Sequence, residues 1–357
     1  MTDDRRRALL ATGVAAMLAT LVRATSAAPL QAGTKREDMP PSPSGTKQEG
    51  MPPSPPGMKQ EGMPSSPPGM KQEGMPSSRI GTKQDDTPSS QGSRKQRDTS
   101  FSPATHRTHA MTSSLHYQNA ELVYRTGGQE GAPTIVLLHG GLGSMEDFAP
   151  LLPRLQQQFR TVEIDTRGHG LSTRGDAPLT YAQIADDVRH IVDAIGLAAF
   201  HLFGFSDGGT AAYRIAAEDG RVQLVLTVGA QWHSRDTPRD MFENLTVADM
   251  REHMPTQVAA YEKRNPRPDL SALVDDLRRL WMDDTAAGFP NDLVAGIGAP
   301  VLAARGEADF LLSLDALSAL QKVLPDVHLM NVPFASHEVI REQPDMLWAA
   351  MKVFHAG

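Results

Sequence analysis

The segment 201–213, with sequence HLFGFSDGGTAAY, constrains the fold more than any other stretch of the chain. A short apolar run leads to Ser206, and small residues then open what we expect to be a helix. Gly204 and Gly208 stand two residues before and two residues after the serine, which is the G-x-S-x-G pattern of a sharp strand-to-helix turn. A Cβ at either glycine would collide where the strand and helix cross. An ordinary glycine-rich turn fits the same five letters, so the surrounding sequence has to decide between the two interpretations.

Apolar runs and amphipathic stretches alternate around this segment. We expect a hairpin over 115–124, turning around Asn119-Ala120, because two short alternating runs flank these residues. Continuous apolar runs predict buried parallel strands, and helical spacing of apolar residues predicts helices between them. The predicted strands are 134–139, 161–165, 199–205, 222–229, 300–306 and 327–332, and the predicted helices are 148–158, 180–195, 313–324 and 345–354. The alternation indicates an α/β fold with a mostly parallel sheet and helices on both faces.

Residues 231–295 interrupt this alternation. The segment is charged, rich in helix-forming residues and broken by prolines, so we expect a helical lid at about 231–295, between two core strands. Its aromatic residues either line a pocket or pack onto the core. They are Trp232, Phe242, Tyr261, Trp281 and Phe289, of which we single out Trp232 as a candidate substrate contact.

The first 28 residues have the features of an export signal. Arg5-Arg6-Arg7 precedes an uncharged apolar run at 8–22, and small residues follow at 25–27. The paired arginines resemble a twin-arginine signal, and the run is shorter than the ~20 residues that a spanning helix needs. We therefore expect no stable membrane span and an exported protein, periplasmic or secreted. If translation starts instead at Met111, the protein is cytoplasmic.

A repeat follows the signal. Glycines at 33, 45, 57, 69 and 81 each open a twelve-residue unit close to GMKQEGMPSSPP, so that five units cover 33–92. Proline and glycine interrupt both helices and strands, and each unit holds too few apolar residues to form a core. We expect residues 29–110 to form a disordered linker, with the folded domain at 111–357.

The charge of the chain is divided unevenly. Residues 1–110 hold 15 Lys/Arg and 10 Asp/Glu, whereas residues 111–357 hold 20 and 32, and the formal total is -7. The acidic body repels phosphate groups, so we expect no nucleic-acid partner. The chain has no cysteine, which excludes disulfides, thiol catalysis and cysteine-based zinc sites. We expect no metal and no cofactor, and the composition leaves the oligomeric state open.

The order of several motifs resembles that of the α/β-hydrolase family, over about residues 115–357. In chain order these motifs are HGGLG at 139–143, DTRGHGLS at 165–172, GFSDGG at 204–209, PVLAARGEAD at 300–309 and ASHEVIREQP at 335–344. The resemblance implies an oxyanion loop, a turn after the next core strand, the nucleophile elbow, the strand carrying the acid and the histidine loop, respectively.

A serine hydroxyl needs a base, and a histidine oriented by a carboxylate supplies one. His337 follows a strand in a loop of small residues, and Asp309 follows another strand, so we expect Ser206, Asp309 and His337 to form a triad in this fold's usual order. Other candidates fit less well. His139 and His169 adjoin glycines in loops, His201 starts a core strand, and Glu307 lies closer to its strand than Asp309 does.

By the same resemblance, the backbone N–H of Asp207 and one from Gly141 or Leu142 are expected to form the oxyanion hole. The side chain of Asp207 either caps its helix or pairs with a cationic group of the substrate. The second interpretation follows from the similarity of GFSDGG to the elbow of valacyclovirase-like amino-acid-ester hydrolases.

The sequence thus predicts a serine hydrolase for a small-molecule ester or lactone, working through an acyl-enzyme. Carbon–carbon bond hydrolysis and perhydrolysis use the same triad and stay open. A non-catalytic ligand-binding protein on this fold is the remaining alternative.

Overall fold

The computed structural model describes residues 107–356 of the 357-residue chain. The predicted export signal at 1–28 and nearly all of the predicted linker at 29–110 lie outside the described residues. Within 107–356, no helix combines the length and the apolar character that crossing a bilayer requires.

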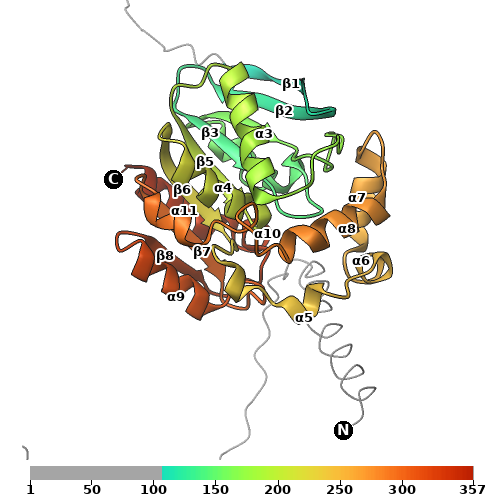
Figure 1. Cartoon of the computed structure of the whole chain (residues 1–357). Helices are drawn as coiled ribbons and strands as arrows, with labels where there is room; N and C mark the ends of the chain where they lie inside the picture. The colour runs from blue at the N-terminus through green and yellow to red at the C-terminus, as the bar shows by residue number, and fades with distance from the viewer. Residues whose placement is uncertain (1–106, 357) are drawn as a thin grey trace, which may run out of the picture. The chain divides into compact units, whose positions relative to one another are not determined.

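An eight-stranded sheet forms the centre of the described residues (Figure 1). The strand order is β1-β2-β4-β3-β5-β6-β7-β8, with β2 antiparallel to β1 and β4 and every other pair parallel. The strands are β1 (Arg107–Tyr117), β2 (Ala120–Gln129), β3 (Thr134–Leu138), β4 (Arg160–Ile164), β5 (Phe200–Phe205), β6 (Val222–Val228), β7 (Val301–Gly306) and β8 (His328–Val332). The predicted mostly parallel sheet is confirmed.

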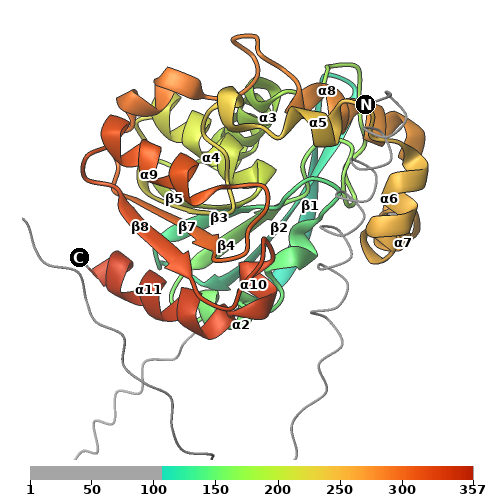
Figure 2. The same cartoon turned by 90° about the horizontal axis from the view of Figure 1, so that it is seen from below.

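Helices cover both faces of the sheet (Figure 2). One face carries α3 (Tyr181–Ala194), α4 (Asp207–Glu218) and α9 (Leu314–Val323), and the other carries α2 (Leu152–Leu155), α10 (Val339–Glu342) and α11 (Pro344–Ala356). Two apolar clusters result, and β3 contributes to both. Val136 and Leu138 belong to one cluster, and Ile135 and Leu137 belong to the other. This double burial explains why the central strands are continuously apolar rather than alternating.

Two sequence-based boundaries need correction. The hairpin turns at Gln118 and Asn119, whose φ angles are 50° and 59°, and Ala120 already belongs to the return strand. Positive φ at both central residues is the geometry that matches the twist of a two-residue hairpin.

The predicted continuous helix at 148–158 is wrong. The chain forms a 3-10 turn, η2 (Met145–Phe148), and then the single-turn helix α2. Pro153 lies in the first turn of α2. Proline is tolerated at a helix start but not inside a helix, because it lacks the N–H and clashes with the preceding turn. The helix therefore has to begin again at this point.

The segment 231–295, which we call the lid, lies between β6 and β7. It contains η3 (Ser234–Asp236), α5 (Arg239–Phe242), α6 (Val247–His253), α7 (Pro255–Arg264), α8 (Leu270–Trp281) and most of η4 (Asn291–Gly296). Its prolines mark helix starts, because Pro238 precedes α5 and Pro255 opens α7. A capping box formed by Thr246 and Asp249 begins α6.

Candidate active site

Ser206 lies at the junction of β5 and α4, in a backbone conformation that few side chains adopt, with φ 51° and ψ -120°. The crossing of strand and helix is tight. A Cβ on Gly204 would lie 2.3 Å from the carbonyl oxygen of Gly208, and one on Gly208 would lie 2.0 Å from that of Leu138. Only glycine fits at these two positions. The close approach carries Ser206 to the carboxyl edge of the sheet, where its hydroxyl is accessible.

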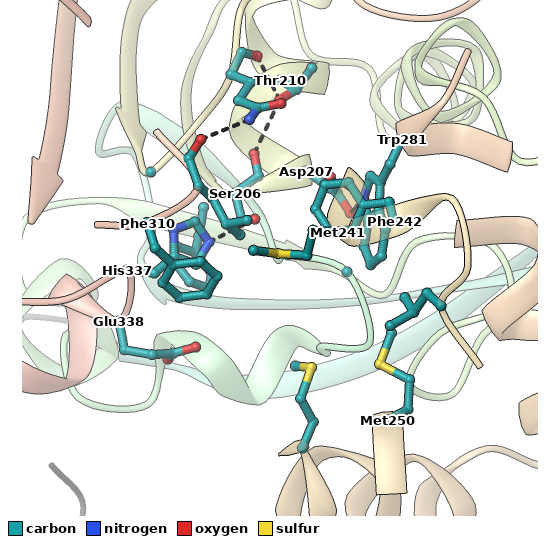
Figure 3. A pocket seen from close by; sticks show the side chains of 18 of the residues that line it. Ser206, Asp207, Thr210, Met241, Phe242, Met250, Trp281, Phe310, His337 and Glu338 are labelled. Carbon is teal, nitrogen blue, oxygen red and sulfur yellow. Dashed lines mark hydrogen bonds between the residues drawn. The ribbon is translucent and has the colours of Figure 1, made fainter. Parts of the chain in front are cut away.

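Two loops at the same edge bring Asp309 and His337 to the serine. His337 Nε2 lies 3.0 Å from Ser206 Oγ (Figure 3). His337 Nδ1 lies 3.1 Å from each carboxylate oxygen of Asp309. Since the carboxylate accepts the Nδ1 proton, Nε2 is left with a lone pair facing the hydroxyl. The arrangement can therefore remove a proton from Ser206.

The electrostatics support the same division of roles. Burial lowers the pKa of His337, but the charge of Asp309 and its hydrogen bond outweigh burial and raise that pKa above its ordinary value of 6.5. Burial raises the pKa of Asp309, whereas His337 and the N–H groups of Leu311 and Leu312 lower it, with a net lowering. A lowered pKa favours the ionised form of Asp309, and a carboxylate in this position can stabilise a protonated His337.

The other candidate residues occupy structural positions. His139 Nε2 accepts the N–H of Thr166 at 3.0 Å. Burial lowers the pKa of His169 to about 3. His201 packs edge-on against Phe159, and the carboxylate of Glu307 accepts the N–H of the exposed Phe334.

Two residues that sequence reasoning missed shape the surroundings of His337 and Asp309. Gly229 has a φ of 62°, and a Cβ there would lie 2.7 Å from His337 Cε1. The buried Arg305 guanidinium donates to the carbonyl oxygens of Asp309 and Leu312, at 2.8 and 2.6 Å. These bonds brace the turn that presents Asp309. An arginine inside an apolar strand was the available signal for this role.

The two candidates in the predicted oxyanion loop differ in position. Gly141 lines the same cavity as Ser206, whereas Leu142 is buried outside that cavity, with a φ of 57°. The neighbouring Gly140 would place a Cβ 3.0 Å from Ser206 Cβ. The loop therefore passes directly beside the serine, and of the two predicted donors Gly141 is the residue at the cavity.

The cavity at Ser206 has a volume of about 120 Å³, and the lid forms one of its walls (Figure 3). Its apolar lining consists of Phe205, Met241, Phe242, Leu245, Met250, Met254, Trp281, Phe310 and Leu311. Three carboxylates, Asp207, Asp249 and Glu338, also line it, and no lysine or arginine among residues 107–356 does.

The prediction that Trp232 contacts substrate is wrong. Trp232 is 1% exposed, and its Nε1 donates to the carbonyl oxygen of Ala316 at 2.9 Å. Among the predicted aromatics, Phe242 and Trp281 line the cavity. The side chain of Asp207 is buried at the cavity wall, where it accepts hydrogen bonds from Tyr181 and Trp281. It is therefore not a surface cap.

Comparison with known proteins agrees with this architecture. A model of the alpha/beta hydrolase fold matches residues 133–297. The 2-(acetamidomethylene)succinate hydrolase of Mesorhizobium japonicum is 28% identical over 243 residues, covering 62% of this chain and 87% of the relative.

Two solved structures show the same fold. The enol-lactonase from Burkholderia xenovorans LB400 has a TM-score of 0.55 at 22% identity, covering 69% of this chain and 100% of the other. A meta-cleavage product hydrolase from Pseudomonas fluorescens IP01 has a TM-score of 0.58 at 19% identity, covering 68% and 97%. The chain has the α/β-hydrolase fold, and this fold together with its hydrolase relatives supports a hydrolase.

Proposed function

We propose that the protein is a serine hydrolase that cleaves a small ester-like or lactone substrate through an acyl-enzyme. The observation that carries the proposal is the continuous chain of contacts from Ser206 Oγ through His337 to Asp309, at one end of an apolar cavity. Nucleophile, base and orienting carboxylate are all side chains, so the proposed reaction needs no metal or cofactor.

Each step of the proposed reaction has a group in place. Ser206 Oγ attacks the carbonyl carbon while His337 Nε2 takes the hydroxyl proton, and Asp309 stabilises the imidazolium. The backbone N–H groups of Asp207 and Gly141 stabilise the oxyanion. The imidazolium then protonates the leaving alcohol or ring oxygen, and a water activated by His337 hydrolyses the acyl-enzyme.

The cavity restricts the substrate by size and charge. Its volume of about 120 Å³ is comparable to the roughly 150 Å³ cavity that holds benzene in another protein, which favours a compact apolar group. The described part of the chain lines the cavity with carboxylates and with no lysine or arginine, which disfavours an anionic substrate. We therefore propose a neutral or cationic substrate, in contrast to the succinate named for the Mesorhizobium relative.

Covalent labelling tests the proposal. A fluorophosphonate probe should label Ser206 in the wild type and leave Ser206→Ala unlabelled, and p-nitrophenyl acetate should be hydrolysed only by the wild type. Labelling at another residue would contradict the assigned nucleophile. If Ser206 is labelled but no ester or lactone is hydrolysed, carbon–carbon bond hydrolysis or perhydrolysis is favoured. If Ser206 is not labelled and no substrate is hydrolysed, a non-catalytic ligand-binding protein is favoured.

A cationic substrate group facing Asp207 is a second candidate within the same function. It is favoured by the buried carboxylate at the cavity wall, which forms no salt bridge among the described residues. A panel of esters that differ only in acyl-chain charge tests it. The wild type should hydrolyse cationic esters faster than neutral ones, and Asp207→Asn should reduce this difference. If either result fails, the pairing is refuted.

A further inference from the structure

The residue after the nucleophile connects parts of the molecule that are far apart in the sequence. We propose that Asp207 is a positioning residue, whose carboxylate ties lid helix α8 and the oxyanion loop to the nucleophile elbow through Trp281 and Tyr181. The inference rests on the proposed function only in taking Ser206 as the nucleophile.

The carboxylate joins the ends of three helices. Trp281 Nε1 donates to its two oxygens at 2.9 and 3.0 Å, and Tyr181 Oη donates to Oδ1 at 2.7 Å. Asp207 is the first residue of α4, Tyr181 is the first of α3, and Trp281 is the last of α8. Figure 3 shows Asp207 and Trp281 on the same side of the cavity. One acidic group thus fixes the end of a lid helix beside Ser206.

The partners of Asp207 are neutral hydrogen-bond donors. No lysine or arginine forms a salt bridge with it in the described part of the chain. A buried carboxyl group left without donors costs free energy. Burial raises the pKa of Asp207, and the hydrogen bonds from Tyr181 and Trp281 oppose that rise by favouring the ionised form. We therefore expect Tyr181 and Trp281 to keep their positions against Asp207, because losing either one would leave the buried carboxylate with one hydrogen bond fewer.

The predicted oxyanion loop, at 139–143, packs against both Asp207 and Trp281. A Cβ on Gly141 would lie 2.5 Å from Asp207 Oδ2 and 2.9 Å from Trp281 Cζ2. The indole ring also packs against Phe242, with ring centroids 4.6 Å apart. Movement of Trp281 would therefore disturb a cavity wall and the loop that carries a predicted oxyanion donor.

The positioning role differs from cation binding in what it requires of residue 207. Positioning requires an acceptor oxygen, which asparagine keeps, whereas cation binding requires the negative charge, which asparagine lacks. Both donors reach Oδ1, so one amide oxygen can serve both of them. Asp207→Asn and Asp207→Ala therefore separate the two roles.

The test measures kcat and KM on p-nitrophenyl acetate, a neutral ester, for wild type, Asp207→Asn, Asp207→Ala, Tyr181→Phe and Trp281→Phe. Asp207→Ala should lower kcat about 10-fold to 100-fold, because small displacements of catalytic groups have effects of this size. Asp207→Asn should lose about fivefold or less, the loss expected for weakening one hydrogen bond. Equal losses in the asparagine and alanine variants would overturn the positioning role, as would an alanine variant with normal kcat.

A readout independent of turnover uses 5-fluorotryptophan and ¹⁹F NMR. The chain has three tryptophans, and the resonance missing from Trp281→Phe identifies Trp281. This resonance should shift or broaden in Asp207→Ala and stay close to its wild-type position in Asp207→Asn. If the Trp281 resonance does not move in Asp207→Ala, Asp207 does not position Trp281. This conclusion holds even if Ser206 proves not to be the nucleophile. If Asp207→Ala does not fold, Tyr181→Phe replaces it, with the same expected direction.

Discussion

The floor of the cavity, by which we mean the junction of β5 and α4 around Ser206, differs from the lid in how it is packed. In the floor, backbone packs against backbone, so a Cβ on Gly208 would lie 2.0 Å from the Leu138 carbonyl oxygen. In the lid, the contacts toward the cavity are side chains, most of them methionine, leucine and aromatic, and ion pairs such as Arg251–Glu262 lie on the exposed side. We therefore expect added atoms to be costly in the floor, whereas substitutions in the lid should mainly alter which substrates fit.

The largest predicted effect concerns the proposed triad, which lies at the floor side of the cavity rather than in the lid. Asp309→Asn should reduce kcat on p-nitrophenyl acetate about 10⁴-fold, because the asparagine no longer stabilises the imidazolium or the required tautomer. The matched control is Glu307→Gln, which lies on the same loop and should lose less than about fivefold. Steady-state kinetics on both variants measure the contrast, and a greater loss in Glu307→Gln would move the acid to Glu307.

The second prediction concerns the packing of the elbow. Gly208→Ala should lower the free energy of unfolding by about 3 kcal/mol or more, since the added methyl group meets backbone that cannot move aside. Gly220→Ala is the control, because a Cβ there meets no atom within 4 Å. Urea denaturation measures both changes. A Gly208→Ala variant as stable as the control would mean that the floor is as adaptable as the lid.

The third prediction is a pH dependence. Protonated His337 cannot accept the Ser206 proton, so kcat/KM should fall as pH drops through the pKa of His337. The fall should have its midpoint above 6.5, because Asp309, Glu338 and Asp207 outweigh burial and raise that pKa. In Asp309→Asn the midpoint should move to lower pH. A midpoint that stays in place would assign this titration to another group.

The fourth prediction concerns the lid. Met250→Ala should raise KM about tenfold for the esters that fill the wild-type cavity and leave kcat nearly unchanged, because it removes apolar contact from the wall without touching the triad. Leu293→Ala removes an exposed apolar side chain away from the cavity and serves as the control. A fall in kcat with constant KM would show that the lid also positions the chemistry at this residue.

The smallest predicted effect is on the outer surface of the lid. Arg251→Ala should change the free energy of unfolding by less than about 1 kcal/mol, because Arg251 and Glu262 are 53% and 40% exposed and water screens the pair. Thermal denaturation at low and high salt measures this. A change above about 2 kcal/mol would show that ion pairs, rather than apolar contacts, hold the lid.

The fold class and the order of the strands and helices could be predicted from the amino-acid sequence alone. Burial of β3 on both faces produces an uninterrupted apolar run, and the crossing at Ser206 admits only glycine at 204 and 208. Both constraints involve residues that are close together in the sequence, so they could be predicted without coordinates. The prediction of Asp309 and His337 rests on family resemblance and chain order, and the structure brings both side chains into contact with each other and His337 into contact with Ser206.

Only the tertiary structure decided which side chains meet across distant elements. It directs Trp281 to the cavity and Trp232 into the core, although both are aromatic residues of the lid. It also pairs Asp207 with Trp281, 74 positions away, and places Arg305 against the turn at Asp309. Such contacts depend on how whole helices and strands pack, and no local pattern of residues encodes that packing.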